Sequence, residues 1–541
     1  MADANQTTKT ETYDAVIIGA GVSGMYMLHR LRALGLTARV YEAGSGVGGT
    51  WYWNRYPGAR FDSESYSYGY SFDQGLLQDW DWQEHFAGQP EILQYLEHVA
   101  DRFDLRRDIS FNTRIASAHF DEQATTWEIV AEDGRRARGR FLITALGPLS
   151  APTMPSIPGM EDFQGDAWHT AHWPHEPVSF DGRRVGVIGT GATGVQAITE
   201  IAKTAGTLTV FQRNPNYCAP LGNGPISSAE MDEIRARYPE IFARCRETHG
   251  GFLHNADHRL TMDLSPAERE AVWEKLYHER GFGIWTGNFR DTFTDQAAND
   301  LLSDFVRGKI RARVQDPAVA ELLTPTNHGF GTRRVPLESG YYEVYNQPNV
   351  SLVDIRRNPI ERITKTGIVV DGQEHALDMI IYATGFDAVT GAFSRMDIRG
   401  RAGQSLTDKW ADGPRTNLGL TVAGFPNMLT LVGPHNAGTF CNIPRCIEQN
   451  VDWVSDLMTH MRDQGLASIE TTEAAEDDWT AHVYETAAGS LLSKTDSWFT
   501  GVNQNLPDKK RTFYAYAGGA PAYRKQCDEV AADGYRGFVL G

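Results

Sequence analysis

The sequence lacks several features that mark specialised classes of protein. It has 5 cysteines in 541 residues, and no two of them have CxxC spacing. This excludes a disulfide-rich scaffold and a thioredoxin-like redox centre, so we interpret the cysteines as scattered reduced thiols. No apolar run approaches the length of about 18 residues that a transmembrane helix needs, and the polar N-terminus does not resemble a signal peptide. Residues 1–12 are expected to be a disordered tail.

Positive charge is also scarce. The formal net charge is −18, and no run of Lys and Arg is longer than Lys509–Arg511. A nucleic-acid-binding protein would show a basic stripe, and a negative protein is repelled by anionic membrane surfaces. We therefore expect a cytoplasmic protein, a monomer or a homodimer, that binds no nucleic acid, membrane or metal ion.

Glycine is abundant, with 53 residues, and it forms two patterned turns in a chain long enough for two to four domains. The first turn spans residues 19–24. A buried-strand run, 15–18, precedes it, and a helical pattern with a second strand, 37–41, follows. A comparable strand, turn and helix begin at Arg184. The sequence therefore predicts two Rossmann-like βαβ units, about one domain length apart.

The first turn reads Gly-Ala-Gly-Val-Ser-Gly and includes Gly19, Gly21, Ser23 and Gly24. In such turns the first glycine allows the tight bend, the second lets pyrophosphate approach, and the third packs helix on strand. Glu42 ends the next strand, where a carboxylate can bind the ribose hydroxyls of an adenosine. An acidic residue at this point favours FAD.

The second turn differs at the corresponding strand end, which reads Gln212-Arg213 instead of an acid. A basic residue there suits a 2′-phosphate, so this unit is predicted to prefer NADPH. The alternative is that Arg213 is a solvated surface arginine. The predicted cofactor contacts in this turn are Thr190, Gly191, Ala192, Thr193 and Gly194.

Between the two units lies a segment that fits the pattern F-x-G-x-x-x-H-x-x-x-W-P. Its fixed positions are Phe163, Gly165, His169 and Trp173, followed by proline. The segment resembles the fingerprint of the class B Baeyer–Villiger monooxygenases, flavoproteins that use FAD and NADPH. Residues 48–58 and 383–387 are similar to further family segments, and the resemblance runs from Asp14 to about Gly537. In this family the fingerprint looks like an interdomain hinge.

The resemblance implies a catalytic site as well. Arg334 aligns with the active-site arginine of the family, and Asp62 is implied to lie beside it and orient it. A fixed guanidinium can stabilise the anionic flavin peroxide that attacks a ketone carbonyl. Arg333 stands where the family usually has lysine, at the 2′-phosphate. Without the resemblance, Arg334 would be read as a surface or salt-bridge arginine and Asp62 as a turn cap.

The remaining implied contacts come from several segments. Trp498 lies in a stretch, about 495–510, that resembles the mobile loop closing over NADP, and Phe440, Cys441 and Ile443 are candidates for the ketone pocket. The further residues implied to contact a cofactor are Gly49, Thr50, Trp51, Tyr52, Tyr68, Ile115 and Gln196.

The sequence thus predicts an α/β protein with two Rossmann-like dinucleotide-binding domains and a helical insertion. The FAD domain comprises 1–150 and 388–541, the NADP domain 151–224 and 331–387, and the helical insertion 225–330. The implied reaction oxidises ketones, cyclic ones foremost, to esters or lactones with NADPH and O2. The alternatives are oxygenation of sulfur or nitrogen, a disulfide reductase, and a non-catalytic FAD-binding protein.

Overall fold

The computed structural model describes residues 10–541, apart from the side chains of Thr439 and Phe440. Strand β1 (Glu11–Ile18) begins inside the stretch predicted to be a disordered tail, so that prediction is wrong for Glu11 and Thr12. The reason is pairing, because Glu11 and Thr12 lie in register with Ala137 and Arg138. The rest of the predicted tail, 1–9, lies outside the described residues.

The first sheet has eight strands, six from the first 144 residues and two, β17 and β18, from residues 397–430. Its order is β17-β4-β5-β6-β1-β2-β3, and β18 also pairs with β6. Strand β1 is parallel to β2 and β6, and its last four residues are buried, as expected for a strand covered on both faces. The other bounds are β2 (Ala38–Tyr41), β3 (Ile109–Ser110), β4 (Ile115–Asp121), β5 (Thr126–Ala131), β6 (Arg136–Thr144), β17 (Asp397–Arg399) and β18 (Met428–Thr430).

Long helices cover this sheet, and α1 packs against α14 although more than 400 residues separate them. Helix α14 (Ile443–Asp463) has Pro444 in its first turn, where the fixed φ of proline is compatible with a helix. The other bounds are α1 (Val22–Ala33), α5 (Gln89–Arg102), α15 (Glu473–Ala488) and α17 (Ala520–Ala532).

The second sheet is parallel throughout, in the order β12-β9-β8-β16-β7. Helix α6 (Ala192–Ile201) follows its glycine turn. A small antiparallel sheet, β13-β14-β15, packs against the parallel sheet, and their shared core includes Phe211 and Ile368. Its strands are β7 (Asp166–His169), β8 (Arg184–Ile188), β9 (Thr207–Gln212), β12 (Val350–Asp354) and β16 (Met379–Tyr382), with β13 (Ile360–Ile363), β14 (Gly367–Val370) and β15 (Gln373–Ala376). The predicted α/β class with two Rossmann-like units is confirmed.

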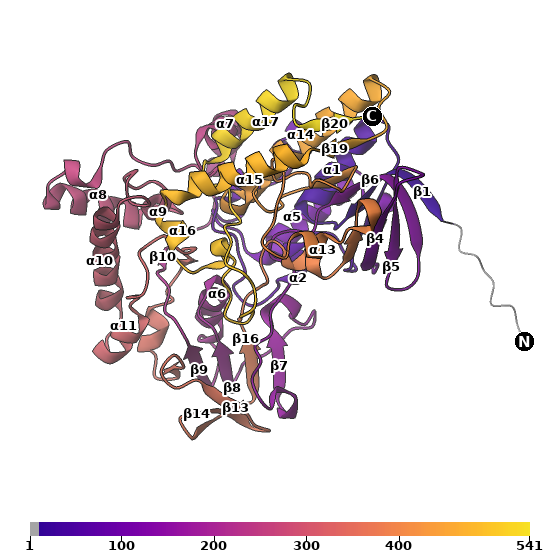
Figure 1. Cartoon of the computed structure of the whole chain (residues 1–541). Helices are drawn as coiled ribbons and strands as arrows, with labels where there is room; N and C mark the ends of the chain where they lie inside the picture. Colours follow the sequence, from indigo (N-terminus) through magenta and orange to yellow (C-terminus); the bar gives the residue numbers. More distant parts are fainter. Residues whose placement is uncertain (1–9) are drawn as a thin grey trace, which may run out of the picture.

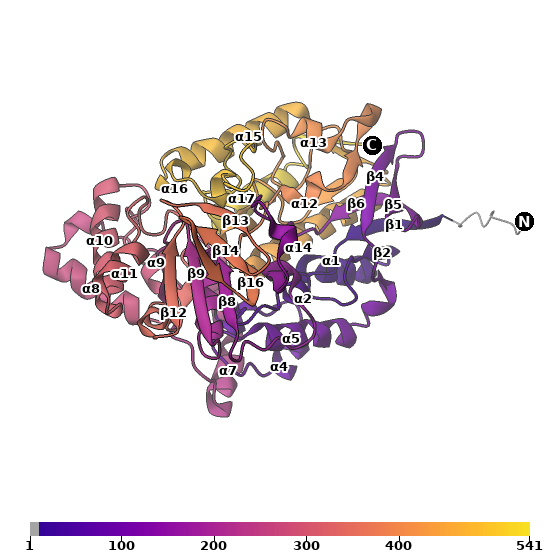
Figure 2. The same ribbon diagram turned by 90° about the horizontal axis from the view of Figure 1, so that it is seen from below.

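The helical insertion forms a lobe whose helices α8, α10 and α11 lie on the flank of the second sheet away from the first sheet (Figures 1 and 2). Four of its five helices start at capping side chains, since Ser227, Ser265, Asp295 and Asp316 each accept an N–H from the first turn. The bounds are α7 (Ser228–Glu247), α8 (Pro266–His278), α9 (Gly283–Thr286), α10 (Gln296–Arg313) and α11 (Pro317–Leu323).

Short elements complete the chain. They are α2 (Thr50–Trp53), α3 (Ser65–Tyr68), α4 (Gln74–Asp79), α12 (Gly391–Ser394), α13 (Leu406–Lys409), α16 (Leu491–Lys494), β10 (Ala219–Pro220), β11 (Leu337–Glu338), β19 (Ile469–Thr471), β20 (Phe538–Leu540), and 3-10 turns including η7 (Ala437–Phe440) and η8 (Trp498–Thr500). Within residues 10–541, no helix is both long and apolar enough to cross a membrane.

One expectation about cysteine is wrong. Cys441 and Cys446 form a disulfide across the start of α14, whereas Cys218, Cys245 and Cys527 are free and buried. A spacing of five residues has no CxxC signal, and only the turn into the helix brings the two sulfur atoms together.

Candidate functional site

The two glycine turns have the same construction. Gly19 and Gly189 both have positive φ, at 105° and 107°. A Cβ on Gly19 would lie 2.5 Å from the carbonyl oxygen of Ala145, and a Cβ on Gly189 would lie 2.5 Å from that of Ala383. Each turn therefore bends against the residue that follows the neighbouring central strand, β6 or β16. The close approach leaves no room for any other side chain.

Both turns present an uncapped helix N-terminus. Gly21 and Gly191 are the N-cap residues of α1 and α6, and neither helix has a side-chain cap or an acid in its first turn. Free backbone N–H groups and the helix dipole favour an anion at such an end. A Cβ on Gly191 would meet no protein atom within 4 Å, and the backbone of Gly21 closely approaches that of Gly49. Both turns fit a pyrophosphate.

The space in front of Gly191 yields a prediction. Gly191→Ala should leave the thermal midpoint near that of the wild type and raise the KM for NADPH about tenfold or more, because the added methyl group occupies ligand space only. Gly194→Ala is the matched control, since its Cβ would collide with the carbonyl oxygen of Gly189. That variant should lose stability. A normal KM in folded Gly191→Ala would show that no ligand approaches this backbone.

The residues implied to hold FAD gather at the first turn. Glu42, 5% exposed, follows β2 and accepts backbone N–H groups from Ala20 at 2.8 Å and Gly44 at 2.7 Å. Ser23 is buried in the first turn of α1, and buried Ile115 begins β4. The Glu42 carboxylate retains acceptor capacity for a ribose hydroxyl, since it uses one bond per oxygen here.

A second segment leads from this turn to the predicted catalytic residues. Gly49 is the N-cap of α2, where Thr50 begins the helix. The indole N–H of Trp51 donates to the hydroxyl of Tyr68 at 2.9 Å, and Tyr68 stacks on Phe61 with ring centroids 4.5 Å apart. Tyr52 is held through its hydroxyl by Ser45. This aromatic cluster fixes the position of Phe61, and therefore of Asp62, which follows it in the chain.

The same segment contacts the second domain. The side chain of Gln196, in α6, donates to the carbonyl oxygen of Arg60 at 3.1 Å and accepts from the hydroxyl of Tyr56 at 2.8 Å. A Cβ on Gly58 would lie 2.6 Å from the carbonyl oxygen of Gln196. The two nucleotide-binding units therefore meet at residues 56–62. This contact is suited to hold two cofactors close to each other.

Arg213, which follows β9, and Arg333 lie close enough for their charges to interact. Burial lowers the pKa of Arg333, and Arg213 lowers it further, while Asp496 opposes the shift. Within residues 10–541 neither guanidinium has a carboxylate at ion-pair distance, and Asp496 pairs with Arg511 instead. Ala192 and Thr193 open α6, and Thr190 is anchored by its hydroxyl to the carbonyl oxygen of Asn214 at 3.0 Å. Two cations with no carboxylate at ion-pair distance among the described residues fit the 2′-phosphate of NADPH.

Arg334 and Asp62 are in contact. The Nη2 atom of Arg334 lies 2.9 Å from Oδ2 of Asp62, and the two side chains are 34% and 8% exposed. Burial raises the pKa of the Asp62 carboxyl, while the guanidinium of Arg334 opposes that shift. The carboxylate fixes one edge of the guanidinium, and the remaining donors are partly open. Such a group can stabilise negative charge that develops on a substrate oxygen.

Phe282 and Trp285 also surround Arg334. Its guanidinium carbon lies 4.9 Å from the ring centroid of Phe282 and 5.3 Å from that of Trp285. Sequence reasoning gave these residues no role, since both belong to the helical insertion, more than 40 residues before Arg334. The signal in the sequence was the Gly-Ile-Trp stretch at 283–285, which resembles a segment of a family member but indicates no role.

The fingerprint residues lie where the chain crosses between domains. His169 ends β7 and accepts the backbone N–H of Ala171 through Nδ1 at 3.0 Å. Its ring contacts Phe386 edge-on, and Trp173 packs on Trp168 and Phe180. Gly165 lies against Phe163, where a Cβ would clash with the ring. The pattern therefore builds a tightly packed segment where the chain passes between the two sheets.

His169 makes the stability pH-dependent. Burial, and then His172, lower its pKa from 6.5 to about 4. The unfolded chain therefore takes up a proton near pH 6.5, whereas the folded protein does so only near pH 4, and the free energy of unfolding should fall as pH drops through this window. We expect His169→Gln to lose less stability than the wild type between pH 7.5 and 5.0, measured by urea unfolding. His258→Gln, at a side chain 94% exposed, is the control and should behave as wild type.

The predicted loop, 495–510, docks on the crossing strands. Thr153 and Thr384 each donate the side-chain hydroxyl to the main-chain carbonyl oxygen of the other. The two segments that pass between the sheets therefore run side by side. Asn505 donates to the carbonyl oxygen of Thr384 at 3.0 Å, Asn503 donates to that of Phe386 at 2.9 Å, and Lys509 pairs with Asp387. Trp498 packs, half-buried, against Ala388, Val389 and Tyr514.

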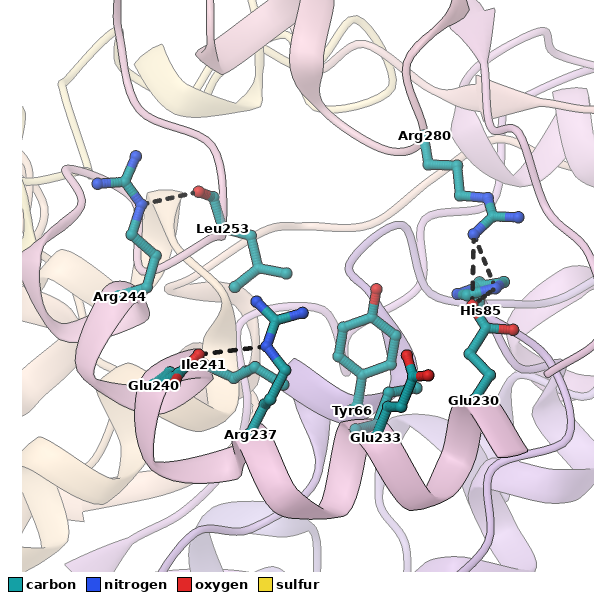
Figure 3. Close-up of a pocket in the computed structure, with 11 residues that line it drawn as sticks. Tyr66, His85, Glu230, Glu233, Arg237, Glu240, Ile241, Arg244, Leu253 and Arg280 are labelled. Atoms are coloured by element: carbon teal, nitrogen blue, oxygen red, sulfur yellow. Dashed lines mark hydrogen bonds and ion pairs between the residues drawn. The ribbon is translucent and has the colours of Figure 1, made fainter. Parts of the chain in front are cut away.

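Of the proposed ketone-pocket residues, Ile443 is half-buried at the first position of α14, and Cys441 is buried in the disulfide. The side chain of Phe440 lies outside the described part of the chain. A separate cavity of about 470 Å³ lies along α7, with Tyr66, His85 and Arg280 on its walls (Figure 3). Arginine and glutamate are equally represented around it, so its charge selects no ligand class.

Comparison with known proteins agrees with this site. The flavin-binding monooxygenase-like family model matches residues 13–219. The chain is 47% identical to 2-oxo-Delta(3)-4,5,5-trimethylcyclopentenylacetyl-CoA monooxygenase of Pseudomonas putida, covering 98% of this chain and 99% of that protein. It is 47% identical to acetone monooxygenase (methyl acetate-forming) of Gordonia sp. strain TY-5, with 98% and 99% covered. It is also 43% identical to phenazine N-monooxygenase of Lysobacter antibioticus, with 98% and 97% covered.

Solved structures agree over the same length. A crystal structure of OTEMO in complex with FAD and NADP matches with a TM-score of 0.95 and 47% identity, covering 98% of this chain and 100% of that one. Identity at this level over the full length shows the family, and the glycine turns, the fingerprint and the Arg334–Asp62 pair agree with it. The chain belongs to the class B Baeyer–Villiger monooxygenases, within the flavin-binding monooxygenase-like proteins.

Proposed function

We propose that this protein oxidises ketones, cyclic ones among them, to esters or lactones with NADPH and O2. The observation that carries the proposal is the partly open Arg334 guanidinium, fixed on Asp62 where the two nucleotide-binding units meet. When bound, FAD and NADPH supply the electrons that activate O2. The full-length relatives named for oxidations of ketones support this choice.

The chain's own groups would act by position and charge. Attack on a ketone carbonyl places negative charge on its oxygen, and the free N–H donors of Arg334 can stabilise it. Asp62 orients the guanidinium through one edge. Arg213 and Arg333 would hold the 2′-phosphate of NADPH, and the N-termini of α1 and α6 the two pyrophosphates. The loop with Trp498 would exclude water from the site.

We propose the domain limits given by the sequence, namely FAD domain 1–150 and 388–541, and NADP domain 151–224 and 331–387 around the helical insertion. Sheet membership supports them, since β17 and β18 join the first sheet and β12 and β16 the second. A cytoplasmic location and a monomeric or homodimeric state remain predictions.

A second candidate is oxygenation of nitrogen, which is favoured by one relative named for that activity. Transfer of oxygen to a nitrogen lone pair develops no alkoxide on the substrate, so it would depend much less on Arg334. The two functions therefore differ in their response to Arg334→Ala. A reductase or a non-catalytic protein would give no oxygenated product at all.

The experiment is a product analysis of the purified protein with FAD, NADPH, O2 and a panel of ketones that includes cyclohexanone and acetone. We expect an ester or lactone in amounts that match the NADPH consumed. Phenazine in a parallel reaction tests the second candidate. NADPH consumption that yields only H2O2 with every ketone would contradict the proposal, and absence of NADPH consumption would indicate a non-catalytic FAD-binding protein.

A further inference from the structure

Three segments that are distant in the sequence converge on the Arg334 guanidinium. Asp62 comes from the segment after α2, Phe282 and Trp285 come from the start of α9, and Arg334 itself lies in the loop that returns from the helical insertion. Both aromatic side chains are 1% exposed. The helical insertion therefore reaches the proposed site of ketone oxidation at Arg334 and Asp62.

Trp285 contacts the loop of Arg334 at a second point. Its indole N–H donates to the carbonyl oxygen of Gly331 at 3.3 Å, three residues before Arg334. Gly331 has a φ of 77°, and a Cβ there would lie 2.7 Å from the indole nitrogen. The loop thus passes too close to the indole for any side chain. One residue contacts both the backbone of this loop and its cation.

The aromatic rings and the carboxylate act on different parts of the cation. The rings of Phe282 and Trp285 offer no conventional hydrogen-bond acceptor, so their contact with the guanidinium leaves its N–H donors for an oxygen acceptor. Aromatic faces attract a cation that has lost water, whereas an aliphatic side chain would remove the water without replacing the attraction. Asp62 alone holds one edge and leaves rotation about that edge unrestrained.

We propose that Trp285, assisted by Phe282, is a positioning residue that holds the Arg334 guanidinium by a cation–π contact, so that the helical insertion is part of the active site. The inference rests on the proposed function, because it assigns Trp285 a part in the same reaction. It predicts that loss of the aromatic face uncouples NADPH consumption from ester formation without impairing hydride transfer from NADPH.

The test compares Trp285→Leu with Trp285→Phe in the FAD-loaded protein. Readouts are ester formed per NADPH, the rate of flavin reduction, and the thermal midpoint. We expect about a tenfold lower ester yield per NADPH for Trp285→Leu, with flavin reduction within about twofold of wild type. Trp285→Phe keeps an aromatic face and should retain most of the yield.

Trp273→Leu is the matched control. Trp273 is a buried residue of the same insertion whose indole packs on Phe289 and Phe305. Its indole N–H donates a hydrogen bond to the side-chain oxygen of Asn288. It should lose stability but keep the ester yield per NADPH. Phe282→Leu should lower that yield severalfold and carries the test if Trp285→Leu does not fold.

Wild-type yield in Trp285→Leu, equal losses in Trp285→Leu and Trp285→Phe, or an equal loss in Trp273→Leu would overturn the inference. Failure of the proposed function itself would be recognised separately, because the wild type would then form no ester.

Discussion

Replacing Arg334 by alanine should abolish ester formation while NADPH still reduces the flavin. Removing one fixed donor from a site that stabilises a developing oxyanion typically costs about 10²–10³ in rate, and Arg334 offers several donors. Its only carboxylate partner within residues 10–541 is Asp62, which holds the guanidinium at the site. Product analysis with cyclohexanone, together with the rate of anaerobic flavin reduction, measures both effects. NADPH oxidation that continues should yield H2O2 instead of lactone.

Two further variants separate charge from geometry at this position. Arg334→Lys keeps a positive charge but loses the planar fork, so we expect a residual ester yield well below that of the wild type. Arg334→Ala leaves the Asp62 carboxyl buried without its guanidinium, and Arg334→Ala/Asp62→Asn removes that charge and should recover stability but no activity. Full ester yield from folded Arg334→Ala would refute the catalytic assignment.

Replacing Arg213 by alanine should raise the KM for NADPH by about one to two orders of magnitude, through loss of a charge-assisted phosphate contact. The KM for NADH should stay nearly unchanged, because NADH lacks the 2′-phosphate. Arg333→Ala should act in the same direction, and the double variant should discriminate little between the two nucleotides. Steady-state kinetics with both nucleotides, at saturating ketone and O2, gives this ratio.

Arg184→Ala is the control for the two arginines. Arg184 lies in the same parallel sheet but at the first residue of β8, at the opposite edge from Arg213, which follows the end of β9. Its exposed guanidinium pairs with Asp378. This variant should keep the preference for NADPH. An unchanged KM for NADPH in Arg213→Ala would place the 2′-phosphate elsewhere.

Much of the fold could be predicted from the sequence, because its signals are local. A buried-strand run, a glycine turn and an apolar helical face lie within about 30 residues of each other, and the turn around Gly19 allows one backbone path. The same holds for Gly189. The residue at each strand end, Glu42 or Arg213, then distinguishes the two nucleotide sites by charge alone.

Local signals failed where distant contacts compete with them. Glu11 looks like part of a polar tail, but pairing with β6 makes it a strand residue. The Cys441–Cys446 disulfide has no recognisable spacing, and the turn into α14 brings the sulfur atoms together. In both cases the deciding partner or turn geometry cannot be read from the residues themselves.

The sequence by itself determined the two nucleotide-binding units, their turns and the charge at each strand end. Only the tertiary structure decided what surrounds Arg334, which the sequence singled out through the family resemblance. An arginine has the same side chain on a surface or in a site, and its role depends on what surrounds it. Arg334 is fixed by Asp62, 272 residues before it, and by Phe282 and Trp285 from the helical insertion. Those contacts form only when the domains pack together.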